Sequence, residues 1–141
     1  MYSVMETMET QCMRALRMIN SRTTPIDKYL YLSSIKATNT DLFYRLLIDN
    51  FDQLMPLVYT PTIGDVCIQY STLYTRPEVL YISIKQRKSI RTILHNWPYP
   101  DPSICVVTDG SRILGLGDLG VNGVGIPVRL YLSPFKGPIH N

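Results

Sequence analysis

Long hydrophobic runs and sorting signals are missing from this sequence of 141 residues. No stretch approaches the roughly 18 apolar residues that a membrane-spanning helix needs. The N-terminus has no cationic start followed by a continuous apolar stretch, which disfavours a secretory signal, and Glu6 and Glu9 disfavour an acid-poor transit peptide. We therefore expect a soluble intracellular protein with no membrane partner, cytoplasmic or mitochondrial, without a preference between these compartments.

The chain also has few cysteines and a low net charge. The three cysteines, Cys12, Cys67 and Cys105, are widely spaced and form no C-x-x-C pair, so they match no zinc-ligand spacing. They cannot all pair within one chain, which favours a reducing compartment. The formal net charge is only +3, from 14 Lys and Arg against 11 Asp and Glu. Nucleic-acid-binding proteins usually cluster more positive charge on one face, so we expect no nucleic-acid partner.

The first 77 residues carry apolar residues at three- and four-residue spacing, which predicts a helical region. Thr24 before Pro25 predicts an N-cap followed by proline at the first helical position. A further helix over residues 39–55 should stop at Pro56, because a residue before proline is pushed out of the helical conformation. The next helix is predicted to start with Thr60 as its cap and proline in its first turn.

The pattern changes after Pro77. Residues 79–84 and 104–108 are rich in β-branched and aromatic side chains and predict two strands. Residues 86–97 between them form a short basic amphipathic pattern, which predicts a helix with a solvated basic face. A strand–helix–strand unit favours parallel pairing. The predicted fold class is therefore α/β: a helical N-terminal segment followed by the first βαβ part of a mostly parallel sheet, with the domain incomplete.

A possible nucleotide-binding motif follows the second predicted strand, where Gly115, Gly117 and Gly120 spell G-x-G-x-x-G. A dinucleotide turn needs a helix directly after the glycines and an acidic residue about 20 positions later. Proline and glycine interrupt the sequence after these glycines, and no Asp or Glu follows Asp118. The context disfavours a small NAD-binding protein, so we predict that this chain binds no cofactor and no metal.

Two longer stretches carry a family resemblance. They are MPLVYTPTIGD at residues 55–65 and VVTDGSRILGLGDLGVNGVGIPV at residues 106–128, with RPEVLYISI and NWP between them. Together with the preceding helices, residues 14–128 resemble the N-terminal domain of malic enzyme; malolactic enzyme shares the motifs. The resemblance implies oxidative decarboxylation of L-malate to pyruvate in the complete protein, with NAD(P) and Mg²⁺ or Mn²⁺. It also implies that the glycine string belongs to the substrate side, with a separate Rossmann domain downstream.

The resemblance assigns roles to two side chains. Tyr59 matches the general acid that protonates the enol left by decarboxylation, and a phenol keeps its proton at neutral pH. Arg112 matches the arginine that binds a malate carboxylate, which a planar guanidinium can hold with two hydrogen bonds. Without the resemblance, Tyr59 would be a packing residue and Arg112 a solvated turn residue. Asp109 and Asp118 are expected to form turns rather than to bind a ligand.

One allosteric feature of some family members is only half matched. Arg14 falls where they carry an arginine of a fumarate site. Thr38 stands where the second arginine would be, and threonine cannot supply its charge. We therefore expect no activation by fumarate.

The resemblance is expected to end abruptly at Val128. The family pattern continues with G-K-L, whose lysine is the proposed base, but here Leu130 takes its place, or Arg129 if one residue is deleted. Leucine has no titratable group and arginine stays protonated, so neither can act as the base. The metal ligands and the NAD(P) domain would lie beyond residue 141. We expect a truncated gene, a splice product or a gene-model artefact, inactive on its own.

The expected organisation has three parts: a helical region at 1–77, the start of a malic-enzyme-like α/β substrate domain at 78–128, and a divergent irregular tail at 129–141. Expected partners are L-malate, bound weakly or not at all by this chain alone, and a homo-oligomer or full-length malic enzyme subunits. The alternative function is a non-catalytic assembly or regulatory module that associates with such subunits. NAD or NADP, and malic or malolactic chemistry, stay open.

Overall fold

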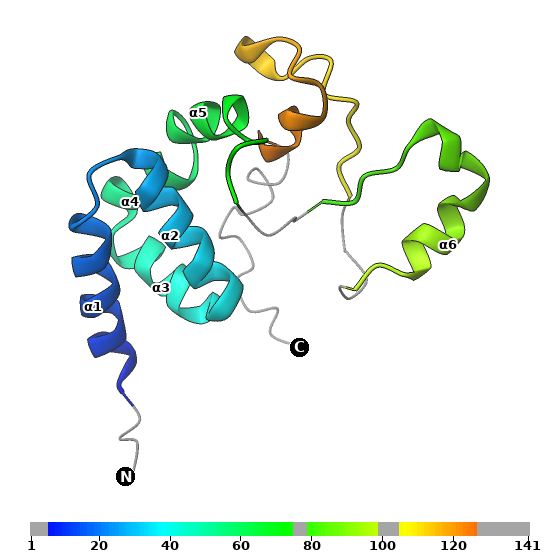
Figure 1. The fold of residues 1–141 in the computed structure, drawn as a ribbon. Helices are drawn as coiled ribbons and strands as arrows, with labels where there is room; N and C mark the ends of the chain where they lie inside the picture. Colours follow the sequence, from blue (N-terminus) through cyan, green and yellow to red (C-terminus); the bar gives the residue numbers. More distant parts are fainter. Residues whose placement is uncertain (1–5, 75–78, 99–104, 127–141) are drawn as a thin grey trace.

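Five α-helices form the body of the molecule, and a shorter helical arm projects from it (Figure 1). The computed structural model describes residues 6–74, 79–98 and 105–126. The elements, in chain order, are α1 (Met8–Asn20), α2 (Pro25–Thr38), α3 (Thr40–Asp49), α4 (Phe51–Val58), α5 (Thr62–Ile68), η1 (Ile84–Ser89), α6 (Ile90–His95), η2 (Leu114–Leu116) and η3 (Gly120–Val124), the η elements being 3₁₀ helices.

Side-chain caps start the first three helices. The hydroxyl oxygens of Thr7 and Thr24 accept the backbone N–H of Thr10 and Asp27, at 3.2 and 3.1 Å. The predicted cap at Thr24 is thus confirmed, with Pro25 in the first turn of α2. At α3, the side-chain oxygen of Asn39 accepts the N–H of Leu42 at 3.1 Å. Each bond satisfies one of the N–H groups that a helix start leaves without a partner.

Three predicted helix boundaries are wrong. The helix expected over residues 39–55 is two helices, because the backbone leaves the helical conformation at Asn50 (φ −132°, ψ 43°). Pro56 does not stop α4, which continues to Val58. Leu54 and Val58, one turn apart, are both buried, so burial of this face outweighs the local cost of the proline. Thr60 does not cap α5: Pro61 occupies the cap position without a side-chain hydrogen bond.

Helices α1 to α4 enclose the first hydrophobic core. Its fully buried members come from all four helices: Ile19, Leu32, Phe43, Leu46 and Leu54. A second core lies between α2, α5 and the segment 105–126. It contains Tyr29, Ile63, Val66, Cys67, Ile113 and Ile126. The second core therefore fixes the glycine-rich segment to the helical body.

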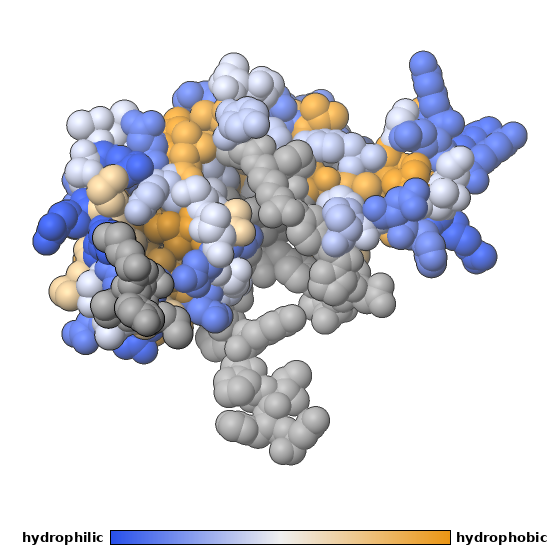
Figure 2. All heavy atoms as spheres, turned by 60° about the horizontal axis from the view of Figure 1, so that its bottom comes forward, coloured by the Kyte–Doolittle hydropathy of each residue, from blue (hydrophilic) through white to orange (hydrophobic). Residues whose placement is uncertain are grey.

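Residues 79–98, which we call the arm, have little contact with the rest of the molecule. Ile84 keeps 83% of its surface exposed, and Ile82, Ile90 and Leu94 are exposed as well. The hydroxyl of Tyr81 reaches the carbonyl oxygen of Val121 at 3.5 Å. Figure 2 shows hydrophilic side chains that project outward from the arm beside apolar surface. The basic face at residues 85–91 is solvated, as expected.

The predicted strands are not formed within the described residues. The chain is irregular over residues 79–83 and 105–108, Ile84 begins η1, and Ile104 lies outside the described residues. The predicted helix between them is present as η1 followed by α6. A strand needs a neighbour for its backbone hydrogen bonds, and no described segment offers one here. The structure thus shows the helical N-terminal region but not the βαβ unit.

Among the helices that the structure describes, none has the length and apolar character required to span a bilayer.

Candidate functional site

The segment 108–120 folds into two turns, each closed by an aspartate. The Oδ1 atom of Asp109 accepts the backbone N–H of Ser111 at 3.0 Å and its hydroxyl at 2.7 Å. These bonds hold the pKa of Asp109 below its ordinary value. The Oδ1 atom of Asp118 accepts the N–H of Gly120 at 2.9 Å. Such bonds to the residue two positions ahead are typical Asx turns, which confirms the expectation that both aspartates form turns.

The two turns lie directly against each other. The N–H of Leu119 donates to the carbonyl oxygen of Gly110 at 3.1 Å. A Cβ added at Gly110 would lie 1.8 Å from the carbonyl oxygen of Gly120, and the φ angle of Gly110 is +72°. Both facts require glycine at this position. We call residues 108–120 the clasp.

The glycines of the G-x-G-x-x-G string have a different role from Gly110. Nothing lies within 4 Å of a Cβ added at Gly115, Gly117 or Gly120. The sequence pattern drew attention to the string and not to Gly110. The close approach at Gly110 joins residues ten positions apart, and no local pattern reveals such a contact.

A short 3₁₀ helix begins at the last glycine of the string. A dinucleotide turn uses the N-terminus of an α-helix that follows the glycines. Here the five-residue 3₁₀ helix η3 begins at Gly120 itself, and Ile126 beyond its end is buried in the second core. Among residues 6–74, 79–98 and 105–126, no cluster of three or more metal-ligating side chains is found.

Arg112 lies in the clasp between two fixed neighbours. Ser111 on one side is bonded to Asp109, and on the other side the N–H of Ile113 donates to the carbonyl oxygen of Gly117 at 2.7 Å. Ile113 is only 4% exposed and belongs to the second core. The Arg112 side chain is exposed and forms no ion pair with any described residue.

Tyr59 ends α4, where its backbone connects two helices. Its N–H donates to the carbonyl oxygen of Met55, and its own carbonyl oxygen accepts the N–H of Ile63, both at 2.9 Å. The half-buried Tyr59 side chain packs against the second core, which also contains Ile113. The structure thus brings Tyr59 and the residue next to Arg112 to the same core.

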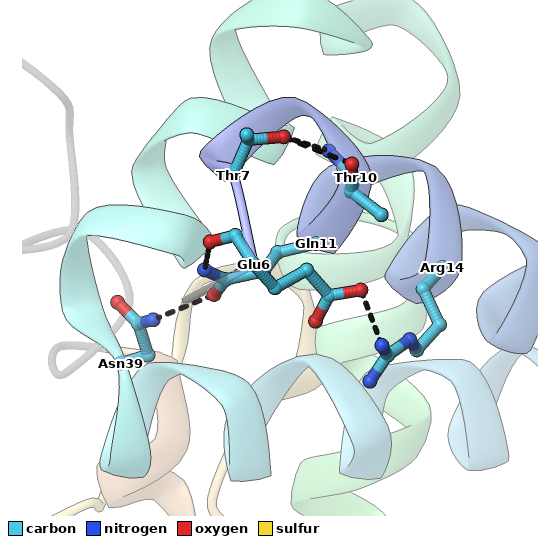
Figure 3. A network of polar contacts seen from close by, with 6 residues as sticks. All are labelled: Glu6, Thr7, Thr10, Gln11, Arg14 and Asn39. Carbon is cyan, nitrogen blue, oxygen red and sulfur yellow. Dashed lines mark hydrogen bonds and ion pairs between the residues drawn. The ribbon is translucent and has the colours of Figure 1, made fainter. Parts of the chain in front are cut away.

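The Arg14 side chain already pairs with a neighbouring acidic side chain. It forms an ion pair with Glu6 just before α1 (Figure 3). In the same network, the side-chain amide of Gln11 donates to the carbonyl oxygen of Glu6 at 2.9 Å, and Asn39 donates to Gln11 at 3.4 Å. The hydroxyl of Thr38 donates to the carbonyl oxygen of Ser34 in its own helix, at 2.9 Å. This network ties the start of α1 to the junction of α2 and α3.

Comparison with known families identifies the family of this chain. The family described as "Malic enzyme, N-terminal domain" matches residues 36–132. This chain belongs to the malic enzyme family. The resemblance carried by residues 55–65 and 106–128 is thus confirmed, and the match continues past Val128. The residues at the place of the family's lysine, Arg129 and Leu130, fall within the match but outside the described residues.

Plant malic enzymes are among the relatives. NADP-dependent malic enzyme 3 of Arabidopsis thaliana is 47% identical over 120 residues, which cover 85% of this chain and 20% of that protein. The NADP-dependent malic enzyme of Vitis vinifera is 46% identical over 125 residues, 89% of this chain and 21% of that protein. The one from Populus trichocarpa is 50% identical over 104 residues, 74% and 18% of the two chains. The chain spans about a fifth of the length of these relatives.

Proposed function

We propose that this chain is the substrate-side N-terminal part of a malic enzyme, whose complete form converts L-malate to pyruvate and carbon dioxide. Membership of the family carries the proposal. The relatives are named as NADP-dependent enzymes, so NADP is the proposed cofactor of the complete protein, together with Mg²⁺ or Mn²⁺. Intracellular location in the cytoplasm or the mitochondrion belongs to the same proposal.

Two side chains act in the proposed reaction. The Arg112 guanidinium binds a carboxylate of malate, and its exposure between two fixed neighbours supports this role. Tyr59 donates its phenolic proton to the carbon of the enol that loss of carbon dioxide leaves behind. Its contact with the core that anchors Ile113 supports a common site for the two side chains.

Alone, the 141 residues are proposed to be inactive. At the place of the family's lysine they offer Leu130 or Arg129, and neither can accept the proton of the malate hydroxyl. Purified chain incubated with L-malate, NADP and Mg²⁺ or Mn²⁺ should therefore produce no NADPH. Malate-dependent NADPH formation would contradict this part of the proposal.

A chimera tests the proposed roles. Residues 36–126 of this chain replace the matching stretch of Arabidopsis NADP-dependent malic enzyme 3, and malate-dependent NADP reduction is measured. In this chimera, Tyr59→Phe should lower kcat by about 10²–10⁴-fold, the usual share of a general acid. Arg112→Gln should act mainly on KM for malate, because the lost bonds hold the bound substrate.

Tyr44→Phe is the matched control, since Tyr44 packs against the first core instead. A correctly assembled chimera without activity, or one in which Tyr59→Phe and Tyr44→Phe have the same kcat, would overturn the proposal. The product separates the two chemistries that the motifs allow, because malic enzyme forms pyruvate and malolactic enzyme forms lactate.

We also propose that the complete protein forms the βαβ unit that the sequence predicts, beginning near residue 78. Ile82, Val106 and Val107 are exposed, Val107 by 90%, and strands covered by a sheet would bury them. Hydrogen exchange gives the test. Amides of residues 80–84 and 105–108 should exchange slowly in the chimera and fast in the 141-residue chain; fast exchange in both contradicts the unit.

The second candidate function is an assembly or regulatory module. Ile48 and Phe51 on the helical body are 64% and 50% exposed, and exposed apolar side chains of this size favour association with another chain. The chain is then expected to form a homo-oligomer or to join full-length malic enzyme subunits and lower their activity. Size-exclusion chromatography with light scattering decides: an unchanged subunit count after mixing with the complete Arabidopsis enzyme removes this candidate.

A further inference from the structure

We propose that Asp109 and Asp118 are positioning residues for Arg112: their two Asx turns lock the clasp and fix the backbone position from which the guanidinium reaches a carboxylate. The proposal rests on the proposed function only for the identity of that carboxylate as a group of L-malate. The resemblance gave neither aspartate a role, and their turn geometry carries the inference.

The first turn fixes the approach to Arg112. Asp109 Oδ1 accepts two hydrogen bonds from Ser111, and the hydroxyl of Thr108 accepts the N–H of Gly110 at 3.0 Å. The two residues before Arg112 therefore have their backbone N–H groups bonded within the turn. A chain held in this way cannot rotate about Ser111 without breaking both bonds to Asp109.

The second turn packs against the first and supports it. Asp118 Oδ1 binds the N–H of Gly120, which sets the position of the Gly120 carbonyl group against Gly110. Leu119 adds its bond to the carbonyl oxygen of Gly110. Loss of the Asp118 turn thus frees the same backbone that the Asp109 turn holds.

The residue after Arg112 completes the clasp. The Ile113 side chain is anchored in the second core, while its N–H is bonded to Gly117. Arg112 is the exposed residue between these two anchors. An arginine with a fixed backbone loses less conformational freedom when it binds a planar carboxylate than a free loop arginine does.

The chemistry of the turns distinguishes this role from a direct one. In both turns the aspartate acts through Oδ1 as a hydrogen-bond acceptor, and the side-chain oxygen of asparagine offers the same acceptor without the charge. A positioning role therefore predicts that Asn replaces Asp at both positions and that Ala does not. A direct role of the carboxylate charge predicts equal loss with Asn and Ala.

The test uses the full 141-residue chain and nuclear magnetic resonance. The heteronuclear Overhauser effect of the Arg112 backbone N–H group reports the order of the clasp at this residue without any ligand. We expect it to fall in Asp109→Ala and Asp118→Ala and to keep the wild-type value in Asp109→Asn and Asp118→Asn. Asp41→Ala, in the first turn of α3, is the control and should leave the signal unchanged.

KM for L-malate in the chimera with the Arabidopsis enzyme adds the functional readout. The Ala variants should raise this KM about tenfold, because the hydrogen bonds that hold Arg112 are lost, and the Asn variants should keep the KM of the unsubstituted chimera. Equal backbone N–H order in wild type and Ala variants, or equal loss in Asn and Ala variants, overturns the positioning role.

Failure of the proposed function looks different. A correctly assembled chimera without activity, or one whose KM for malate Arg112→Gln leaves unchanged, contradicts the malate site, while the backbone N–H measurement on the 141-residue chain still decides the positioning role. Thermal unfolding of each variant shows that the helical body is intact, because the clasp lies outside the first core.

Discussion

Glycine residues in the clasp differ in what the backbone requires of them. We predict that Gly110→Ala lowers the free energy of unfolding by about 1–3 kcal/mol or more, because the new methyl group would overlap the Gly120 carbonyl and the φ angle is positive. Gly115→Ala in the same segment meets nothing within 4 Å and should change it by less than about 0.5 kcal/mol. Urea unfolding measures both. Equal values for the two variants would contradict the close contact at Gly110.

The cysteine side chains should differ in reactivity. Burial, and to a lesser extent the Asp49 carboxylate, raise the pKa of the Cys12 thiol, so less thiolate is present near neutral pH. We expect exposed Cys105 to react first with iodoacetamide, Cys12 to follow and to accelerate more steeply as pH rises above 8, and buried Cys67 to react only on unfolding. Mass spectrometry of the alkylated chain resolves the order; Cys67 reacting first would contradict it.

At the scale of elements, helix starts are the most local features of the fold. Thr24 accepts the N–H of Asp27, and removal of such a cap costs about 1 kcal/mol. Thr24→Ala should therefore lower the midpoint of thermal unfolding, whereas Thr23→Ala, in the residue just before the cap, should leave it nearly unchanged. Calorimetry on both variants is the measurement. Similar midpoints in the two would mean that the hydroxyl of Thr24 does not stabilise α2.

The structural features that were predicted correctly are those that local sequence patterns determine. Apolar spacing predicted the helices of the body, and Thr24 with Pro25 predicted one start. The break at Asn50 and the passage of α4 through Pro56 depend on which faces the first core buries, and this is decided by contacts between helices. The strands depend even more on distant partners, so residues 79–83 stay irregular here despite their β-branched composition.

The candidate site was predictable only in part. The aspartate turns followed from Asp109 and Asp118 in their local context, and the structure confirms both. The contact between Gly110 and Gly120 and the anchoring of Ile113 in the second core did not, because they join residues that no local pattern connects. The roles of Tyr59 and Arg112 came from resemblance and stay proposals.

At the scale of the whole molecule, the part of the chain that the structure describes contains two cores, which differ in what they hold together. The first joins helices that are neighbours in sequence, while the second joins α2 and α5 to a segment beyond residue 104 through Ile113 and Ile126. Replacement of a buried isoleucine by alanine costs about 2–5 kcal/mol. We expect Ile113→Ala to detach the clasp while α1 to α4 stay folded.

Hydrogen exchange followed by mass spectrometry measures this effect. Amides of the clasp should lose protection in Ile113→Ala, while those of α2 and α3 keep theirs. Val107→Ala is the control, since that side chain is 90% exposed. Simultaneous loss of protection in α2 and α3 would show that the two cores unfold as one unit.

The arm also determines where a protease is expected to cut the molecule first. It carries Lys85, Arg87, Lys88 and Arg91 on exposed backbone with no acidic residue between Val79 and Pro98. Trypsin cleaves after these two residue types, and it cleaves fastest where few contacts resist local opening. A brief digest should therefore cut first within the arm, and the helical body and the clasp should stay together through the second core as a nicked complex.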